Sequence, residues 1–289
     1  SFRILRAHFF GSDGSPKAFP LRDKKHTQDD PLDEYIYNLL SKELTDAVCI
    51  RAPGPLITPD LVIVREALCK HSTTAQLRTD LSKIVSIEVK KLERTSLGQI
   101  ARASGLDFNT TPPCGTVRIY DAMKQPIDIR CFYLFVCQER HTRRESLYIL
   151  SALALCDGSV LNEDFEYYLS IVGERTKEIG LGTYGDGANR NRPMLIFSNP
   201  LGVEGLDHTA TIIHHSKYLE KTYADLRLSL MLQRTTRNGE MREFCCYRLA
   251  SDVPAYWKVT NLRDQFPTPK REQRTQPRGK FLLGFEIAH

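Results

Sequence analysis

The sequence predicts a mixed α/β fold in which helices flank a central mixed β-sheet. Several short segments are rich in Val and Ile, as strands are, and they lie between segments with helical spacing. Some of these strands follow one another directly, which a purely parallel α/β sheet does not allow. The composition is 41% hydrophobic and 26% charged, close to globular averages. We expect a single domain over residues 1–289, with a core at about 32–155 and elaborations at about 156–289.

The first expected helix begins at Pro31. Asp30 precedes it as a capping residue, and Asp33 and Glu34 lie in its first turn, where the helix dipole favours acids. Apolar residues then recur at helical spacing up to Leu44.

The remaining elements follow from period and residue type. Strands are expected at Leu56–Glu66, Lys83–Leu92, Thr116–Tyr120, Ile129–Cys137, Leu147–Leu155, Pro193–Phe197 and Glu240–Leu249. Helices are expected at Ser96–Ser104, Glu163–Ile179 and Thr209–Leu232.

The chain shows no signal for a membrane or for secretion. Its apolar runs are far shorter than the ~18–20 residues of a membrane span, and charged residues interrupt the first apolar stretch. The eight cysteines include no CxxC pair. We therefore expect a cytoplasmic protein with free thiols and no membrane partner.

Positive charge gathers near the C-terminal end of the sequence. The segment Lys258–Lys280 holds seven basic and two acidic residues, so its net charge equals the +5 of the whole chain. Three prolines and few apolar residues indicate an extended arm. Such an arm suits a polyanion such as DNA, although a solvated linker is an equally good interpretation.

Two acids and a lysine form the pattern that points most clearly to chemistry. Asp60 follows Pro59 on one expected strand, and Glu88 and Lys90 lie on the next long one. Residues two apart on a strand share a face, so Glu88 and Lys90 project together, and Asp60 joins them if the strands are neighbours. Neither half of this pattern is specific alone, but their order and their apolar β-rich settings favour a site.

Two converging carboxylates favour a Mg²⁺ site, since Mg²⁺ takes oxygen ligands and leaves positions open for water and phosphate. Lys90 beside it would orient water and neutralise charge on the phosphate. This is the equipment for hydrolysing a phosphodiester.

These residues resemble the motif of the PD-(D/E)xK nuclease superfamily, and the basic chain resembles a type II restriction endonuclease within it. The resemblance covers about residues 32–137. It implies a restriction-endonuclease-like core, with Asp60 and Glu88 as metal ligands, Lys90 as the catalytic lysine and the backbone carbonyl of Val89 as a further ligand. It also implies a third acid from the preceding helix, for which Glu34 is the candidate and Asp33, Glu43 and Asp46 are alternatives.

Other basic and amide side chains are candidates for contacts with DNA. Arg and Asn pair with guanine and adenine edges, and Arg also binds phosphates. Solvated turns are the competing interpretation for most of them. The candidates are Arg94, Arg190, Asn191, Arg192, Arg234, Arg237, Asn238, Lys270 and Arg271.

Two lesser motifs carry less weight. Gly180–Gly185 fits GxGxxG but follows a helix signal instead of a strand, so no organic cofactor is expected. His214 and His215 would point about 100° apart on the helix expected there and could not chelate a metal together.

The sequence thus predicts a Mg²⁺-dependent, sequence-specific endonuclease that acts on double-stranded DNA. The resemblance also implies a homodimer, because family members of this kind commonly cut palindromic DNA, whose symmetry a two-fold axis matches. A repair or recombination nuclease with the same core is one alternative. A DNA-binding protein without catalysis is the other.

Overall fold

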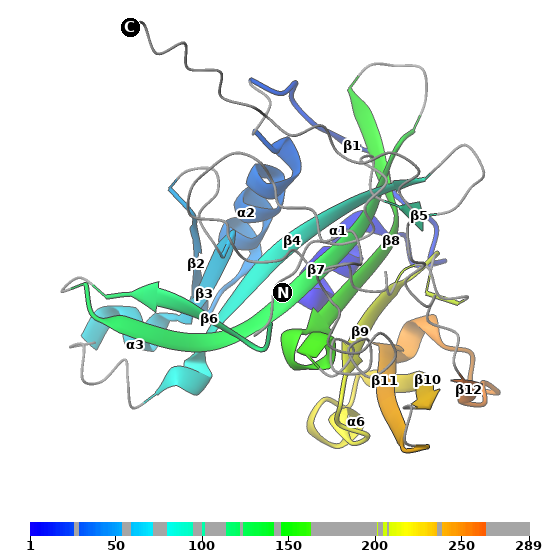
Figure 1. Ribbon diagram of the computed structural model, residues 1–289. Helices are drawn as coiled ribbons and strands as arrows, with labels where there is room; N and C mark the ends of the chain where they lie inside the picture. The colour runs from blue at the N-terminus through cyan, green and yellow to red at the C-terminus, as the bar shows by residue number, and fades with distance from the viewer. Residues whose placement is uncertain are drawn as a thin grey trace, which may run out of the picture.

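A mixed β-sheet forms the centre of the molecule, with helices packed against it (Figure 1). The computed structural model confirms the expected mixed α/β class. In the part of the chain that the structure describes, twelve strands join one sheet, and nine of them follow the order β12-β10-β11-β9-β8-β7-β4-β3-β2. The described residues are 1–25, 29–53, 59–71, 80–94, 100–101, 114–121, 124–141, 146–162, 201, 205–206, 208–235 and 239–263.

The elements have the following bounds. The strands are β1 (Phe19–Pro20), β2 (Ala47–Arg51), β3 (Leu61–Arg65), β4 (Ile84–Arg94), β5 (Ile100–Ala101), β6 (Thr116–Tyr120), β7 (Pro126–Arg140), β8 (Leu147–Asp157), β9 (Ala210–His214), β10 (Leu226–Thr235), β11 (Met241–Leu249) and β12 (Thr260–Arg263). The helices are α1 (Phe2–Phe9), α2 (Pro31–Glu43), α3 (Glu66–His71) and α6 (Leu219–Thr222), with 3₁₀ turns η1 (Leu81–Lys83) and η4 (Ala250–Asp252).

Strands β2, β3 and β4 form an antiparallel meander, and β7 then adds parallel to β4. On the far side of β7, β8 is antiparallel and β9 is parallel to β8. Strand β11 pairs antiparallel with β9 and β10, and β12 closes the edge parallel to β10. The three remaining strands are short branches, because β1 pairs with β8, β5 with β4 and β6 with β7.

Helix α2 forms where the sequence predicts a helix. The Asp30 carboxylate accepts a hydrogen bond of 3.0 Å from Leu32 N, and Pro31 opens the first turn. Leu32, Ile36 and Leu40 are fully buried. Their spacing gives α2 the apolar stripe that holds it against the sheet.

The two faces of the sheet are covered differently. Helices α1 and α2 lie on one face, where they pack with a cluster that includes Leu61, Ile87 and Val89 (Figure 1). Tyr133 and Phe135 of β7 belong to a second cluster on the opposite face. Strand alternation therefore turns Glu88 and Lys90 away from α2.

Two expected elements are wrong. Thr209–Leu232 forms β9, the short α6 and the start of β10 instead of one helix, so the helical argument about His214 and His215 fails. Ile100 and Ala101 pair with Arg94 and Glu93 as β5, where the helix Ser96–Ser104 was expected. Helix α1, helix α3 and strand β2 were not predicted. The expected helix Glu163–Ile179 and strand Pro193–Phe197 lie outside the described residues.

The seven cysteines whose side chains the structure describes are all free and buried. Among the described residues, no helix has both the length and the apolar character that a membrane span requires.

Candidate metal and nuclease site

The register between β3 and β4 brings Asp60 and Glu88 together. Leu61 pairs with Ile87 in this antiparallel pair, so the position before Leu61 lies opposite the position after Ile87. Asp60 thus stands beside Glu88, although 28 residues separate them in the chain. The expectation that the two strands are neighbours is confirmed.

Asp60 is fixed by the backbone of β4. Its Oδ2 accepts a hydrogen bond of 2.7 Å from Val89 N. Burial and, next to it, the charge of Glu88 together raise the pKa of Asp60 to about 7, against the opposing effect of the Val89 hydrogen bond. Two neighbouring carboxylates that are shielded from water repel each other when both are ionised, and a bound cation would offset this repulsion.

Glu88 and Lys90 form an ion pair on the same face of β4. Lys90 Nζ lies 2.8 Å from Glu88 Oε1, and the side chains are 23% and 13% exposed. The Lys90 ammonium also lies 6.0 Å from the centre of the Tyr133 ring. Tyr133 is on β7, where it pairs with Glu88 of β4. Glu88 Oε2 is buried and has no hydrogen-bond partner among the described residues. This oxygen is therefore available as a ligand.

The backbone of Val89 points toward the same place. In a strand, the N–H and C=O of one residue point to the same side. Because the Val89 N–H binds Asp60, its carbonyl faces the same side of β4. The position is consistent with the further ligand that the sequence suggests.

The two acids in the first turn of α2 have different surroundings. Glu34 Oε2 accepts hydrogen bonds from Nε and Nη2 of Arg22 and lies 3.7 Å from Arg51 Nη1, so its carboxylate is held by two cations. Asp33 instead is near Asp60. Burial, together with the charges of Asp30 and Asp60, raises the pKa of Asp33 to about 8. Asp33 is thus the acid of α2 that lies near Asp60, but it comes from the face of the sheet opposite Glu88 and Lys90.

Lys91 marks the opposite face of β4. Its Nζ lies 3.3 Å from Asp30 Oδ2, at the start of α2. The side chains of Lys90 and Lys91, which are adjacent in sequence, therefore project from opposite faces of the sheet.

The candidate DNA-contacting residues are only partly described. Arg94 Nε donates to Glu139 Oε1 at 2.8 Å, and its Nη2 lies 3.1 Å from His208 Nδ1. Arg94 is thus tied to the end of the sheet. Arg234 lies on β10 and pairs with Arg242 in the ladder. The others lie outside the described residues, namely Arg190, Asn191, Arg192, Arg237, Asn238, Lys270 and Arg271.

The basic arm begins as part of the sheet. Residues Thr260–Arg263 form β12, whose partner is β10, and Lys258 and Arg263 are exposed. From residue 264 onward the chain lies outside the described part.

Within the described residues, no group of three or more His, Cys, Asp or Glu side chains is already arranged to hold a metal. Asp60 and Glu88 are two carboxylates, and the carbonyl of Val89 would be the third oxygen. No protein-family model, curated protein or solved structure matches this chain.

Proposed function

We propose that this chain is a Mg²⁺-dependent endonuclease that hydrolyses phosphodiester bonds of double-stranded DNA at specific sequences, as a type II restriction enzyme does. The observation that carries the proposal is the meeting of Asp60 and Glu88 at the start of β3, with Lys90 bound to Glu88. These are the three residues whose pattern resembles the PD-(D/E)xK motif.

The residues fit a divalent cation. In the described part of the chain, Glu88 Oε2 is a buried oxygen without a hydrogen-bond partner, and such an oxygen is rare unless another group satisfies it. The raised pKa of Asp60 has the proximity of Glu88 among its causes. Oxygen ligands from Asp60, Glu88 and the Val89 carbonyl suit Mg²⁺, which would offset both effects.

When bound, Mg²⁺ supplies Lewis-acid chemistry that withdraws charge from a phosphate oxygen. The chain supplies orientation and charge. The Val89 N–H holds the Asp60 carboxylate in place, and Oε1 of Glu88 holds the Lys90 ammonium at the site while Oε2 stays available. Lys90 then neutralises negative charge on the phosphate and orients the attacking water.

Positive charge at β12 supports DNA as the substrate. Lys258 and Arg263 are exposed beside this edge strand, and the sequence continues with further basic residues. Cations placed on phosphates bind a polyanion by releasing counterions. A homodimer remains part of the proposal, because a two-fold axis matches a palindromic site.

Plasmid digestion tests the proposal. The protein is incubated with supercoiled plasmid and Mg²⁺, and then with excess chelator. We expect discrete fragments with Mg²⁺ and no cleavage with chelator. Nicking only at branched or damaged DNA would favour a repair nuclease instead, and a gel shift without cleavage would favour a non-catalytic binder.

A pair of variants on β4 assigns any activity to this site. Glu88→Gln removes the charge of the proposed ligand, so we expect cleavage to be lost. Glu93→Gln removes an exposed acid from the same strand and serves as the matched control. Equal cleavage by both variants would contradict the site.

A further inference from the structure

A cavity lies on the face of the sheet opposite to Glu88 and Lys90. It has a volume of about 520 Å³, within the range of pockets that hold small organic molecules. Val85 and Ile87 of β4 line it, and strand alternation turns these two residues away from Glu88. Helix α1 forms one wall through Phe2. The cavity is therefore separate from the proposed nuclease site.

The floor of the cavity is apolar and its rim is cationic. Aliphatic and aromatic side chains of five neighbouring strands form the floor, namely Ile63, Val85, Ile87, Phe132, Leu155 and Ile212. Four cations line the rim, and they are Arg3, Arg65, Lys83 and Arg130. Asp46 is the one acid among the lining residues, all of which are described.

Three of the rim cations form exposed ion pairs. Arg3 is bound to Asp225, Arg65 to Asp46 and Lys83 to Asp80, with the cationic side chains 48–61% exposed. Exposed pairs of this kind are weak, so their cations can also face an anionic ligand.

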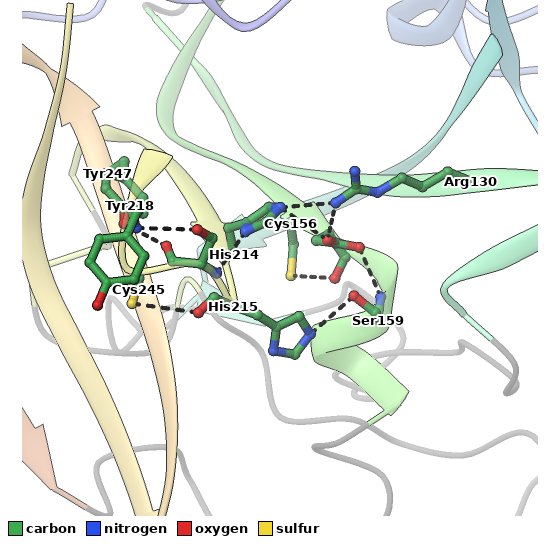
Figure 2. Close-up of polar contacts among 10 residues, drawn as sticks. Arg130, Cys156, Ser159, His214, His215, Tyr218, Cys245 and Tyr247 are labelled. Carbon is green, nitrogen blue, oxygen red and sulfur yellow. Dashed lines mark hydrogen bonds and ion pairs between the residues drawn. The ribbon is translucent and has the colours of Figure 1, made fainter. Parts of the chain in front are cut away.

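Arg130 is held in place by contacts with three residues. Its Nη2 donates to Asp157 Oδ2 at 2.5 Å and lies 2.9 Å from His214 Nε2 (Figure 2). Its guanidinium carbon lies 4.8 Å from the centre of the Phe132 ring. Asp157 is only 3% exposed, so its charge is held behind the guanidinium and not on the cavity surface. These contacts fix the orientation of Arg130.

The donors that point elsewhere remain available. Among the described residues, the hydrogen bonds of Arg130 all use Nη2, and its Nε and Nη1 have no partner. The side chain is 49% exposed. A guanidinium presents its donors as a rigid fork that matches a carboxylate or phosphate.

We propose that this cavity binds a small amphipathic anion, with its apolar body on the sheet floor and its anionic head on Arg130. The floor offers no polar groups that could read a nucleotide base, which favours an aliphatic body. The apolar body of such a ligand would contact the apolar floor, and its anionic head would contact the cationic rim. A single molecule of this kind would lie between α1 and the sheet, so the cavity is a site for a monomeric ligand and not for a lipid surface.

Calorimetric titration with dodecanoate below its micelle concentration tests the proposal. We expect one molecule to bind per chain. The neutral analogue 1-dodecanol should bind about tenfold more weakly, because loss of a charged hydrogen bond costs at least 1.4 kcal/mol. Absence of dodecanoate binding, or equal affinity for both probes, would overturn the proposal. Binding to phosphatidylserine vesicles without binding to dodecanoate would also overturn it.

Variants locate the ligand. Arg130→Gln should weaken dodecanoate binding about tenfold, whereas Arg118→Gln, an exposed arginine paired with Asp128 on the neighbouring hairpin, should not change it. Arg130→Gln leaves Asp157 without its partner and can lower the stability of the fold. Ala47→Phe therefore provides a second test, since it fills the cavity from β2 and should abolish binding. Unchanged binding by Ala47→Phe would place the ligand elsewhere.

The nuclease proposal can fail without affecting this one. Lys90→Ala should retain full dodecanoate binding, because Lys90 lies on the opposite face of the sheet. Loss of binding in that variant would contradict a separate site.

Discussion

Asp60 and Asp33 are two acids that the fold keeps largely from water and near one another. Burial is the main cause of the raised pKa of each acid. The charge of Glu88 also raises the pKa of Asp60. The charges of Asp30 and Asp60 also raise the pKa of Asp33. A carboxyl whose pKa is higher in the folded than in the unfolded chain binds more protons when folded. Its ionisation therefore destabilises the fold, and stability falls as the pH rises from about 4 through the folded-state pKa.

The variant Asp33→Asn should remove part of this pH dependence. We expect it to be more stable than the wild type at pH 8.5 by roughly 1–3 kcal/mol and similar to it near pH 4, because the wild type then carries a neutral Asp33. Urea unfolding without divalent cations at the two pH values measures the difference. A constant difference between the two proteins at both pH values would argue against an ionising Asp33.

At the scale of single residues, the sequence predicts much of the site. Glu88 and Lys90 lie on one face because strand alternation is a fixed geometric rule, and Asp60 joins them through the antiparallel register. The choice between Asp33 and Glu34 could not be predicted. It depends on the rotation of α2 about its axis and on Arg22, a residue outside the helix that donates hydrogen bonds to the Glu34 carboxylate.

At the scale of elements, the C-terminal strands show where pattern alone fails. Leu219, Tyr223, Leu226 and Leu230 fit a helical period, but Leu226, Leu228, Leu230 and Leu232 fit the period of two equally well. Pairing with β11 on one side and β12 on the other makes β10 a strand. Short segments of this kind are decided by tertiary pairing, which a single sequence does not reveal.

The junction after β8 gives a test at this scale. A Cβ at Gly158 would lie 1.9 Å from Cys114 O and 2.8 Å from Cys131 O, both of which are backbone atoms. Gly158→Ala should therefore destabilise the protein by about 2 kcal/mol or more, since these backbone atoms must move.

Gly115→Ala is the control for that change. Its Cβ would approach other atoms no closer than 3.3 Å, so we expect a smaller loss. Thermal melting compares the two variants. A loss for Gly158→Ala no larger than that of the control would show that the junction can relax.

At the scale of the whole molecule, residues far apart in the chain tie α1 to the end of β11. Both Arg6 Nε and Nη2 donate to the Asp252 carboxylate of η4 at 2.6–2.7 Å, and Arg6 Nη1 also donates to Phe10 O and Gly11 O. The Arg6 and Asp252 side chains are only 7% and 10% exposed. We therefore expect the first helix and the segment that follows β11 to unfold together.

Removing this tie should be costly. Arg6→Ala leaves Asp252 buried without a cation, so we expect a loss of about 3–5 kcal/mol in the free energy of unfolding. Arg3→Ala breaks the exposed pair with Asp225 one turn away, and we expect a loss of at most about 1 kcal/mol. Chemical denaturation measures the free energy of unfolding of the two variants. Similar losses in both would indicate that burial of the Arg6–Asp252 pair contributes little to stability.

The central claim is that Lys90, on the face of β4 that carries Glu88, acts in the hydrolysis of DNA. The most direct measurement is Mg²⁺-dependent cleavage of plasmid by Lys90→Ala and by Lys91→Ala, whose lysine faces Asp30 on the other side of the strand. We predict that Lys90→Ala cleaves at least ~10²-fold more slowly while it still binds DNA, and that Lys91→Ala cleaves within a few-fold of the wild type. Cleavage by Lys90→Ala at the wild-type rate would contradict the account.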